Sequence, residues 1–130
     1  MKHVLQPPGW AAPKGYVNGV ATQGRQVFVA GQIGWNAQCQ FESDDLVAQV
    51  RLALLNVRAV LAEAGAQPEH IARMTWYLVD KREYLSRVRE IGAVYREVIG
   101  DYHIAMTAVQ VVALIEDRAK VEIEVTAVVP

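Results

Sequence analysis

The sequence predicts a single α+β domain whose elements follow the order ββαβαββ. Its 130 residues suit one domain. Two stretches, 44–64 and 83–99, place apolar residues at the spacing of amphipathic helices, and shorter stretches alternate apolar and polar residues as strands do. No linker, low-complexity tract or internal repeat interrupts the chain, so we expect residues 1–130 to form one domain.

The N-terminal part is expected to hold an irregular lead-in and then two short strands. Prolines stiffen the first segment, 1–15. The strands are predicted at 17–22 and 26–32. Gly24 lies in the turn between them, and glycine readily supplies the positive φ that hairpin turns need.

The first helix is predicted over residues 44–64. Its apolar side chains fall on one side at helical spacing, and they are Leu46, Val50, Ala53, Leu54, Val57 and Leu61. Ser43 or Asp44 can cap its start, and acidic residues are expected in its first turn. Gly65 suits the left-handed position that ends many helices.

The C-terminal part predicts a strand at 71–79, the second helix at 83–99, and strands at 105–112 and 120–129. Two helices can cover only one face of the resulting mixed sheet. The strand at 105–112 is mostly apolar on both faces, and exposed apolar surface of this kind usually marks an interface. We therefore expect an oligomer in which sheets cover one another.

Composition excludes several classes of protein. Thirteen basic and fourteen acidic residues give a net charge of −1 without a basic cluster, which argues against a nucleic-acid partner. No apolar run approaches the roughly 20 residues of a membrane helix. A single cysteine, Cys39, fits a reducing cytoplasm. The three histidines lack the spacing of metal ligands, so no metal or other cofactor is expected.

Several stretches match one known family in order and spacing. They are Gly15–Val20, Val27–Ile33, Gln49–Asn56, Ala105–Val112 and Val121–Glu124. Together they resemble the Rid family of reactive intermediate deaminases, also called YjgF-type, UK-type or endoribonuclease L-PSP-like proteins. The resemblance implies a chorismate-mutase-like fold, a homotrimer whose sheets face inward, and clefts for small-molecule ligands between subunits.

The resemblance also implies roles for individual residues. In deaminating members, a glutamate on the last strand positions the water that attacks an imine carbon, and this position is Glu122 here. A tyrosine and a Gly-Gln pair complete the cleft, and they match Tyr16, Gly31 and Gln32. The arginine that grips the carboxylate of a 2-imino acid is replaced by Met106.

The residues alone leave alternatives at each of these positions. Glu122 and Glu124 lie on one side of a strand, so either could face a cleft, or both could be solvated charges; the resemblance favours Glu122. Met106 suits an apolar pocket wall and equally an ordinary interface. Without an arginine, binding of a carboxylate should weaken ten- to a hundredfold or more, because a charge-assisted bond contributes roughly 1.5–3 kcal/mol.

Trp35 and Thr107 are further candidates for binding the substrate, although Trp35 and Tyr16 could equally serve packing. Two functions fit this set. The first is a hydrolytic deaminase of a small imine or enamine, with Glu122 as base and a more apolar cleft than 2-imino acids require. The second is a non-catalytic trimeric module that binds a metabolite or stabilises a partner enzyme. The charge balance disfavours ribonuclease activity.

Overall fold

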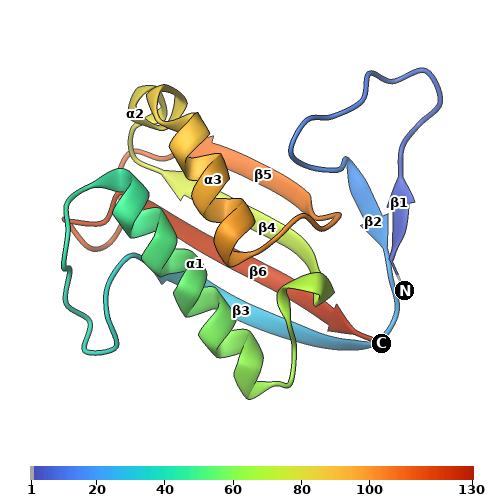
Figure 1. Cartoon of the computed structure of the whole chain (residues 1–130), viewed down its shortest axis with the longest axis horizontal. Coiled ribbons are helices and arrows are strands. Elements are labelled where there is room, and N and C mark those ends of the chain that lie inside the picture. Colours follow the sequence, from blue (N-terminus) through green and yellow to red (C-terminus); the bar gives the residue numbers. More distant parts are fainter. Residues whose placement is uncertain (1) are drawn as a thin grey trace.

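A mixed four-stranded sheet forms the centre of the computed structural model, which describes residues 2–130 (Figure 1). In spatial order, its strands are β3 (Arg25–Ile33), β6 (Val121–Val129), β4 (Ile71–Leu78) and β5 (Ala105–Gln110). β4 and β5 are parallel, and the other neighbours are antiparallel. The predicted α+β class is confirmed, and each of these strands overlaps its predicted range.

Three helices lie on one face of this sheet (Figure 1). They are α1 (Leu46–Glu63), α2 (Lys81–Ser86) and α3 (Val88–Val98), and a short 3-10 turn, η1 (Pro68–His70), precedes β4. All six apolar side chains predicted for the inner side of α1 are buried. The prediction that helices cover one face is therefore confirmed, although their number was wrong.

The second predicted helix is broken at Arg87, which separates α2 from α3. Arg87 leaves helical geometry, with φ −116° and ψ 14°. Its guanidinium binds Glu90 within α3 and Asp45 at the start of α1, with N–O distances of 2.8 and 2.9 Å. Helical spacing of apolar residues continues across this break, so the sequence pattern did not reveal it.

The cap of α1 also differs from the prediction. Asp45, rather than Ser43 or Asp44, accepts a hydrogen bond from the Ala48 amide at 3.0 Å. Ser43 accepts from the Asp45 amide instead, and the first turn of α1 holds no acidic residue. Gly65 has the expected positive φ, 69°.

The first two predicted strands do not form a hairpin with each other. β2 (Gly19–Ala21) pairs with β1 (His3–Leu5), a strand that lay within the predicted irregular lead-in, whereas β3 pairs with β6. Gly24 has the expected positive φ, but its Cα lies against the end of β6, where an added Cβ would collide with the Val129 carbonyl. Pairing with β6 thus takes β3 away from β2.

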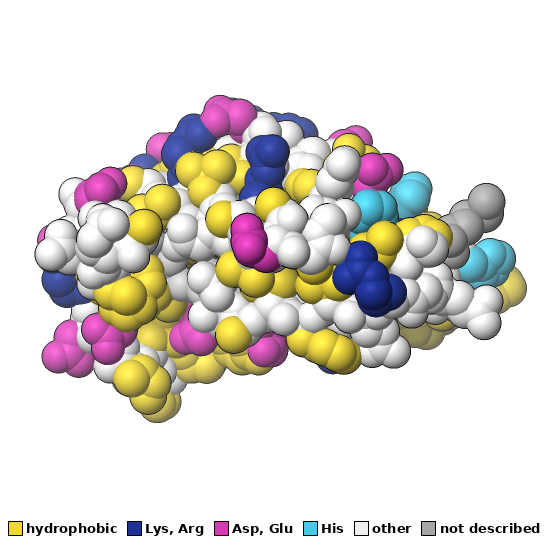
Figure 2. Space-filling view, turned by 90° about the horizontal axis from the view of Figure 1, so that it is seen from below, with side chains coloured by type: hydrophobic (Ala, Val, Ile, Leu, Met, Phe, Trp, Pro, Cys, Tyr) yellow, Lys and Arg dark blue, Asp and Glu magenta, His cyan; other side chains and the backbone are white. Residues whose placement is uncertain are grey.

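The uncovered face of the sheet is more polar than β5 alone suggested. On β4 and β6, buried side chains that face the helices alternate with polar ones, which are Arg73, Thr75, Tyr77, Glu122, Glu124 and Thr126. Phe28 of β3 is an apolar exception, with 72% of its surface exposed. On the side of the molecule seen in Figure 2, hydrophobic side chains lie among both acidic and basic ones.

Candidate functional site

A groove of about 570 Å³ runs between β5, the helices α2 and α3, and the loop 14–16. Tyr16, Met106 and Thr107, three of the seven residues predicted for one site, all line it. The loop reaches β5 because the Val17 amide donates a hydrogen bond to the Ile104 carbonyl at 3.2 Å. This backbone contact sets Tyr16 beside a strand that lies some 90 residues later in the chain.

The floor of the groove is aromatic and uncharged. Trp76 of β4 is buried, and its ring lies 6.4 Å from that of Tyr84 and 6.3 Å from that of Tyr95, between centroids. Burial raises the pKa of both tyrosines, so their phenols stay protonated near neutral pH. Exposed charged residues, Arg96 among them, stand only at the rim.

A second predicted pair, Gly31 and Glu122, is in direct contact. A Cβ on Gly31 would lie 2.7 Å from Cδ of Glu122 and would collide with its Oε2. The strand pairing is irregular between Val29 and Gln32, which brings the Gly31 backbone under the β6 carboxylate. Residue 31 must therefore be glycine if Glu122 is to keep this position. Gln32 donates a hydrogen bond from Nε2 to the Ala30 carbonyl at 3.0 Å.

The neighbouring carboxylate, Glu124, has a different environment. The Tyr77 hydroxyl donates a hydrogen bond to Glu124 Oε1, and this bond raises the pKa of Tyr77. Within residues 2–130, no side chain donates a hydrogen bond to the Glu122 carboxylate. Glu124 is thus engaged by a phenol, whereas Glu122 lies over a glycine with its oxygens unpaired.

The side chains of Met106 and Glu122 lie on opposite faces of the sheet, whereas Thr107 follows Met106 on β5 and pairs in register with Thr75 of the uncovered face. Glu122 alternates along β6 with Val121 and Ile123, which are buried beneath the helices, so it points to the uncovered face. Met106 pairs in register with the buried Met74 and packs against the core. Within one chain, the sheet therefore separates Glu122 from the groove.

The sequence model of the Endoribonuclease L-PSP family matches residues 8–129. The chain belongs to this family, the Rid family. TdcF of Escherichia coli, named as a reactive intermediate deaminase, is 33% identical over an alignment that covers 98% of both chains. A RutC family protein of Aquifex aeolicus is 32% identical over 78% of this chain and 79% of its own.

Solved Rid structures share the fold. YyfB of the Rid family from Yersinia pestis superposes with a TM-score of 0.77 at 31% identity, covering 98% of each chain. The structure of TdcF from Escherichia coli, which contains bound serine, gives a TM-score of 0.70 at 31% identity and covers 98% of this chain and 99% of TdcF. The predicted resemblance is confirmed.

Trp35 occupies a different environment from the other predicted residues of the Rid site. Its ring lies 5.7 Å from that of Phe41, between centroids, and the Arg118 guanidinium covers the Phe41 ring. Its carbonyl accepts a hydrogen bond from Asn56 at 2.9 Å. Trp35 is not among the described residues that line the groove, so in this chain it packs a loop.

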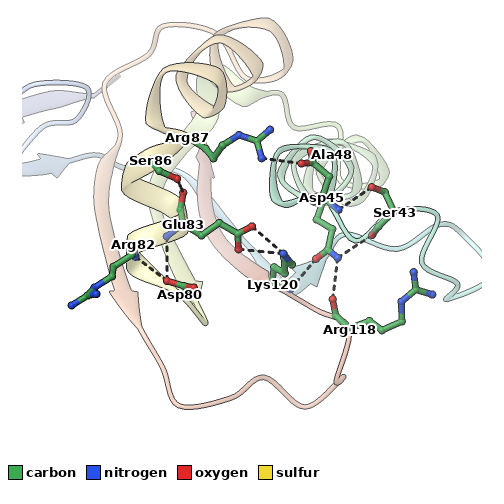
Figure 3. A network of polar contacts seen from close by, with 11 residues as sticks. Ser43, Asp45, Ala48, Asp80, Arg82, Glu83, Ser86, Arg87, Arg118 and Lys120 are labelled. Carbon is green, nitrogen blue, oxygen red and sulfur yellow. Dashed lines mark hydrogen bonds and ion pairs between the residues drawn. The ribbon is translucent and has the colours of Figure 1, made fainter.

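A buried polar network holds the beginning of β6, the strand of Glu122 (Figure 3). Gln49 of α1, only 1% exposed, accepts from the Lys120 amide at 2.8 Å. Its Nε2 donates to the carbonyls of Ser43 and Arg118 at 3.1 and 3.0 Å. Lys120 also pairs with Glu83 of α2 at 3.0 Å. These bonds join three parts of the chain just before the candidate acid.

The structure adds groove residues that sequence reasoning missed, namely Trp76, Tyr84 and Tyr95. They come from three elements, and each fits an ordinary core position in the sequence pattern, so only the fold reveals that they converge. Among residues 2–130, no group of three or more His, Cys, Asp or Glu side chains is placed to hold a metal ion. None of the described helices is long and apolar enough to cross a membrane.

Proposed function

We propose that this protein is a hydrolytic deaminase of a small reactive imine or enamine, and that Glu122 activates the attacking water in a cleft between subunits. The contact between Gly31 and Glu122 carries the proposal, because it fixes an unpaired carboxylate on the uncovered face of the sheet. The likeness to TdcF, named as a reactive intermediate deaminase, supports the same reaction class.

The chemistry requires one group that first accepts and then returns a proton. The Glu122 carboxylate takes a proton from water as the water oxygen bonds to the imine carbon, and the C=N double bond becomes a single bond to an amine. The carboxylic acid then returns that proton to the amine. The new hydroxyl group then passes its own proton through the same carboxylate to the nitrogen, and ammonia leaves with the C–N bonding electrons as the carbonyl forms, so imine and water give a carbonyl compound and ammonia.

A cleft between copies follows from the separation of the two residue groups. Glu122 points away from the helices, whereas Tyr16 and Met106 face the groove beside β5. A substrate can meet both groups only where the uncovered face of one copy lies against the β5 edge of another. The expected homotrimer would provide such seams, and their closed head-to-tail arrangement is the kind that rings adopt.

Met106 narrows the class of substrate. The family position holds an arginine that grips a carboxylate, and a thioether offers neither charge nor donor. We therefore propose that the substrate is not a standard 2-imino acid held by that clamp. TdcF was solved with serine, and this chain should bind such an amino acid more weakly.

Met106 also supports a second candidate, a non-catalytic module that binds a small metabolite. A family member that lost the carboxylate-binding arginine but kept the groove could still bind a metabolite without reacting with it. Thermal denaturation with a panel of metabolites separates the two functions, since a ligand of the folded state raises its stability whether or not it reacts.

The test of the deaminase compares two neighbouring glutamates. Imines are generated in situ by a flavin-dependent amine or amino-acid oxidase, and ammonia release is followed with and without the protein. Glu122→Gln should reduce the rate by roughly 10²–10⁴-fold, the usual contribution of general acid–base catalysis. Glu124→Gln, which keeps an acceptor for Tyr77, should change it less than about threefold. Equal rates for the wild type and Glu122→Gln would reject the assignment.

A further inference from the structure

The groove contains a polar atom that the protein leaves without a partner. Trp76 is 3% exposed, and its Nε1 is a buried side-chain nitrogen with no hydrogen-bond acceptor among the described residues. An unsatisfied buried donor costs about 1–3 kcal/mol. Because Trp76 also lines the groove, a bound molecule with an acceptor could remove this cost.

The rings around Trp76 favour a flat ligand. Tyr84 meets the indole edge-to-face, Tyr95 lies at a tilted 39°, and both are only half buried. Nε1 itself is buried, so a ligand can reach it only if a neighbouring side chain moves aside. A ring that enters there can stack on aromatic neighbours, which prefer centroid separations of about 4.5–7 Å.

Charge in the groove points the same way. The cationic groups, Lys14 and Arg96, are exposed at the rim, and Asp101 stands with them. Met106 and Trp76 offer no charge on the inner wall. A carboxylate placed against that wall would lose water without gaining a partner, which is costly.

We propose that the groove binds the planar aromatic part of an uncharged ligand, and that the Trp76 indole N–H donates a hydrogen bond to a carbonyl or imine acceptor on it. Binding in the groove does not depend on the proposed function; only the identification of this ligand as the substrate rests on it. The substrate class is then an aromatic imine or enamine without a carboxylate near the acceptor.

The binding test needs no turnover. Benzamide, which has a ring and a carbonyl, is titrated into the protein by calorimetry or ligand-observed NMR, alongside toluene and benzoate. Trp76→Phe keeps an aromatic ring but removes the donor, so it should weaken benzamide about five- to tenfold. The affinity for toluene should be unchanged, which also shows that the variant keeps its groove. Trp10 lies in the N-terminal segment and is exposed. Trp10→Phe is therefore the matched control, and it should change neither the affinity for benzamide nor that for toluene.

Benzoate should bind at least about tenfold more weakly than benzamide to the wild type. Equal or tighter binding of benzoate would overturn the preference for an uncharged ligand. The hydrogen bond to Trp76 would be rejected by equal affinities of Trp76→Phe and wild type for benzamide.

A turnover assay separates this inference from the deaminase proposal. The imine that a flavin-dependent amine oxidase forms from benzylamine is compared with the one that an amino-acid oxidase forms from alanine. Faster ammonia release from the aromatic imine supports both proposals. Benzamide binding without turnover of either imine would support the groove as a binding site and reject the deaminase proposal. Turnover of the alanine imine alone would keep the deaminase reaction and overturn the aromatic substrate class.

Discussion

The groove beside β5 and the contact between Gly31 and Glu122 differ in almost every physical respect, although one sheet carries both. The groove is aromatic, lies on the helix-covered side and keeps charges at its rim. The Gly31–Glu122 contact presents a carboxylate on the uncovered face. One region is suited to holding a ligand and the other to moving a proton, and a single chain keeps them apart.

Under the proposed deaminase function, this separation makes each copy of the chain chemically incomplete. A deaminase needs substrate and base within hydrogen-bond reach of one water. The groove and the Glu122 carboxylate lie on opposite sides of one hydrogen-bonded sheet, so no local movement of a side chain can bring them together. Assembly is therefore part of the proposed site.

The largest expected effect comes from mixing two inactive variants. Glu122→Gln removes the base, and Ala108→Trp fills the groove with a bulky ring. Each alone should be inactive in the imine assay. When the two are unfolded and refolded together in equal amounts, about a quarter of the seams in a ring would combine an intact acid with an intact groove. Activity should return to about that fraction, measured by ammonia release.

Two separately refolded variants, mixed only afterwards, are the control for this experiment. If their activity equals that of the co-refolded sample, subunits exchange rapidly between assemblies. The control is then repeated with each variant crosslinked before mixing. Failure of the co-refolded mixture to exceed either variant alone would show that acid and groove act within one copy.

A smaller but still large effect is expected at Gly31. In Gly31→Ala the new methyl group displaces the Glu122 carboxylate, which is the flexible end of a side chain, so the fold should survive. Ammonia release should fall by roughly 10²-fold, because the base loses its position. Benzamide binding should change much less than the rate, since the substitution alters no residue that lines the groove in its own chain.

Gly19→Ala provides the comparison for that substitution. Its added Cβ would approach the Leu5 side chain at 3.3 Å, and Gly19 belongs neither to the groove lining nor to the Gly31–Glu122 contact. It should alter neither rate nor ligand affinity. A Gly31→Ala protein with full activity would disprove the view that this glycine exists to seat Glu122.

Much of the fold could be predicted from the sequence because local patterns carry it. The apolar spacing of α1 and the alternation on β4 and β6 arise from burial of one side, which leaves a period in the sequence. The break at Arg87 has no such signal, since a partner on another helix, Asp45, helps to fix it. The pairing of β2 with β1 has no local signal either. β3 pairs with β6, which leaves β2 without the partner that the sequence predicted for it.

The site was predicted in part, for a related reason. The resemblance supplied Tyr16, Glu122 and Gly31, and the structure then placed the acid and the glycine in contact. The sequence pattern does not show that Glu122 and the groove lie on opposite faces of the sheet. Trp76 could not be distinguished from a core residue, because its unpaired nitrogen is a property of the surroundings.

The smallest expected effect separates the two regions by their response to alkali. Burial raises the pKa of Tyr95 in the groove above the unfolded value of about 10. Below pH 10 both states keep the proton and the stability is full; as the pH rises past 10 the unfolded chain ionises first, so the free energy of unfolding falls. Between pH 10 and 11 this loss is about 1 kcal/mol for one tyrosine.

Tyr95→Phe should therefore reduce the decline in the free energy of unfolding between pH 10 and 11 by about that amount, measured by urea denaturation. Tyr102→Phe, at an exposed position, is the control and should not reduce it. An identical decline in Tyr95→Phe and wild type would mean that water already reaches this phenol, and the groove floor would then be wetter than a site for uncharged aromatic ligands requires.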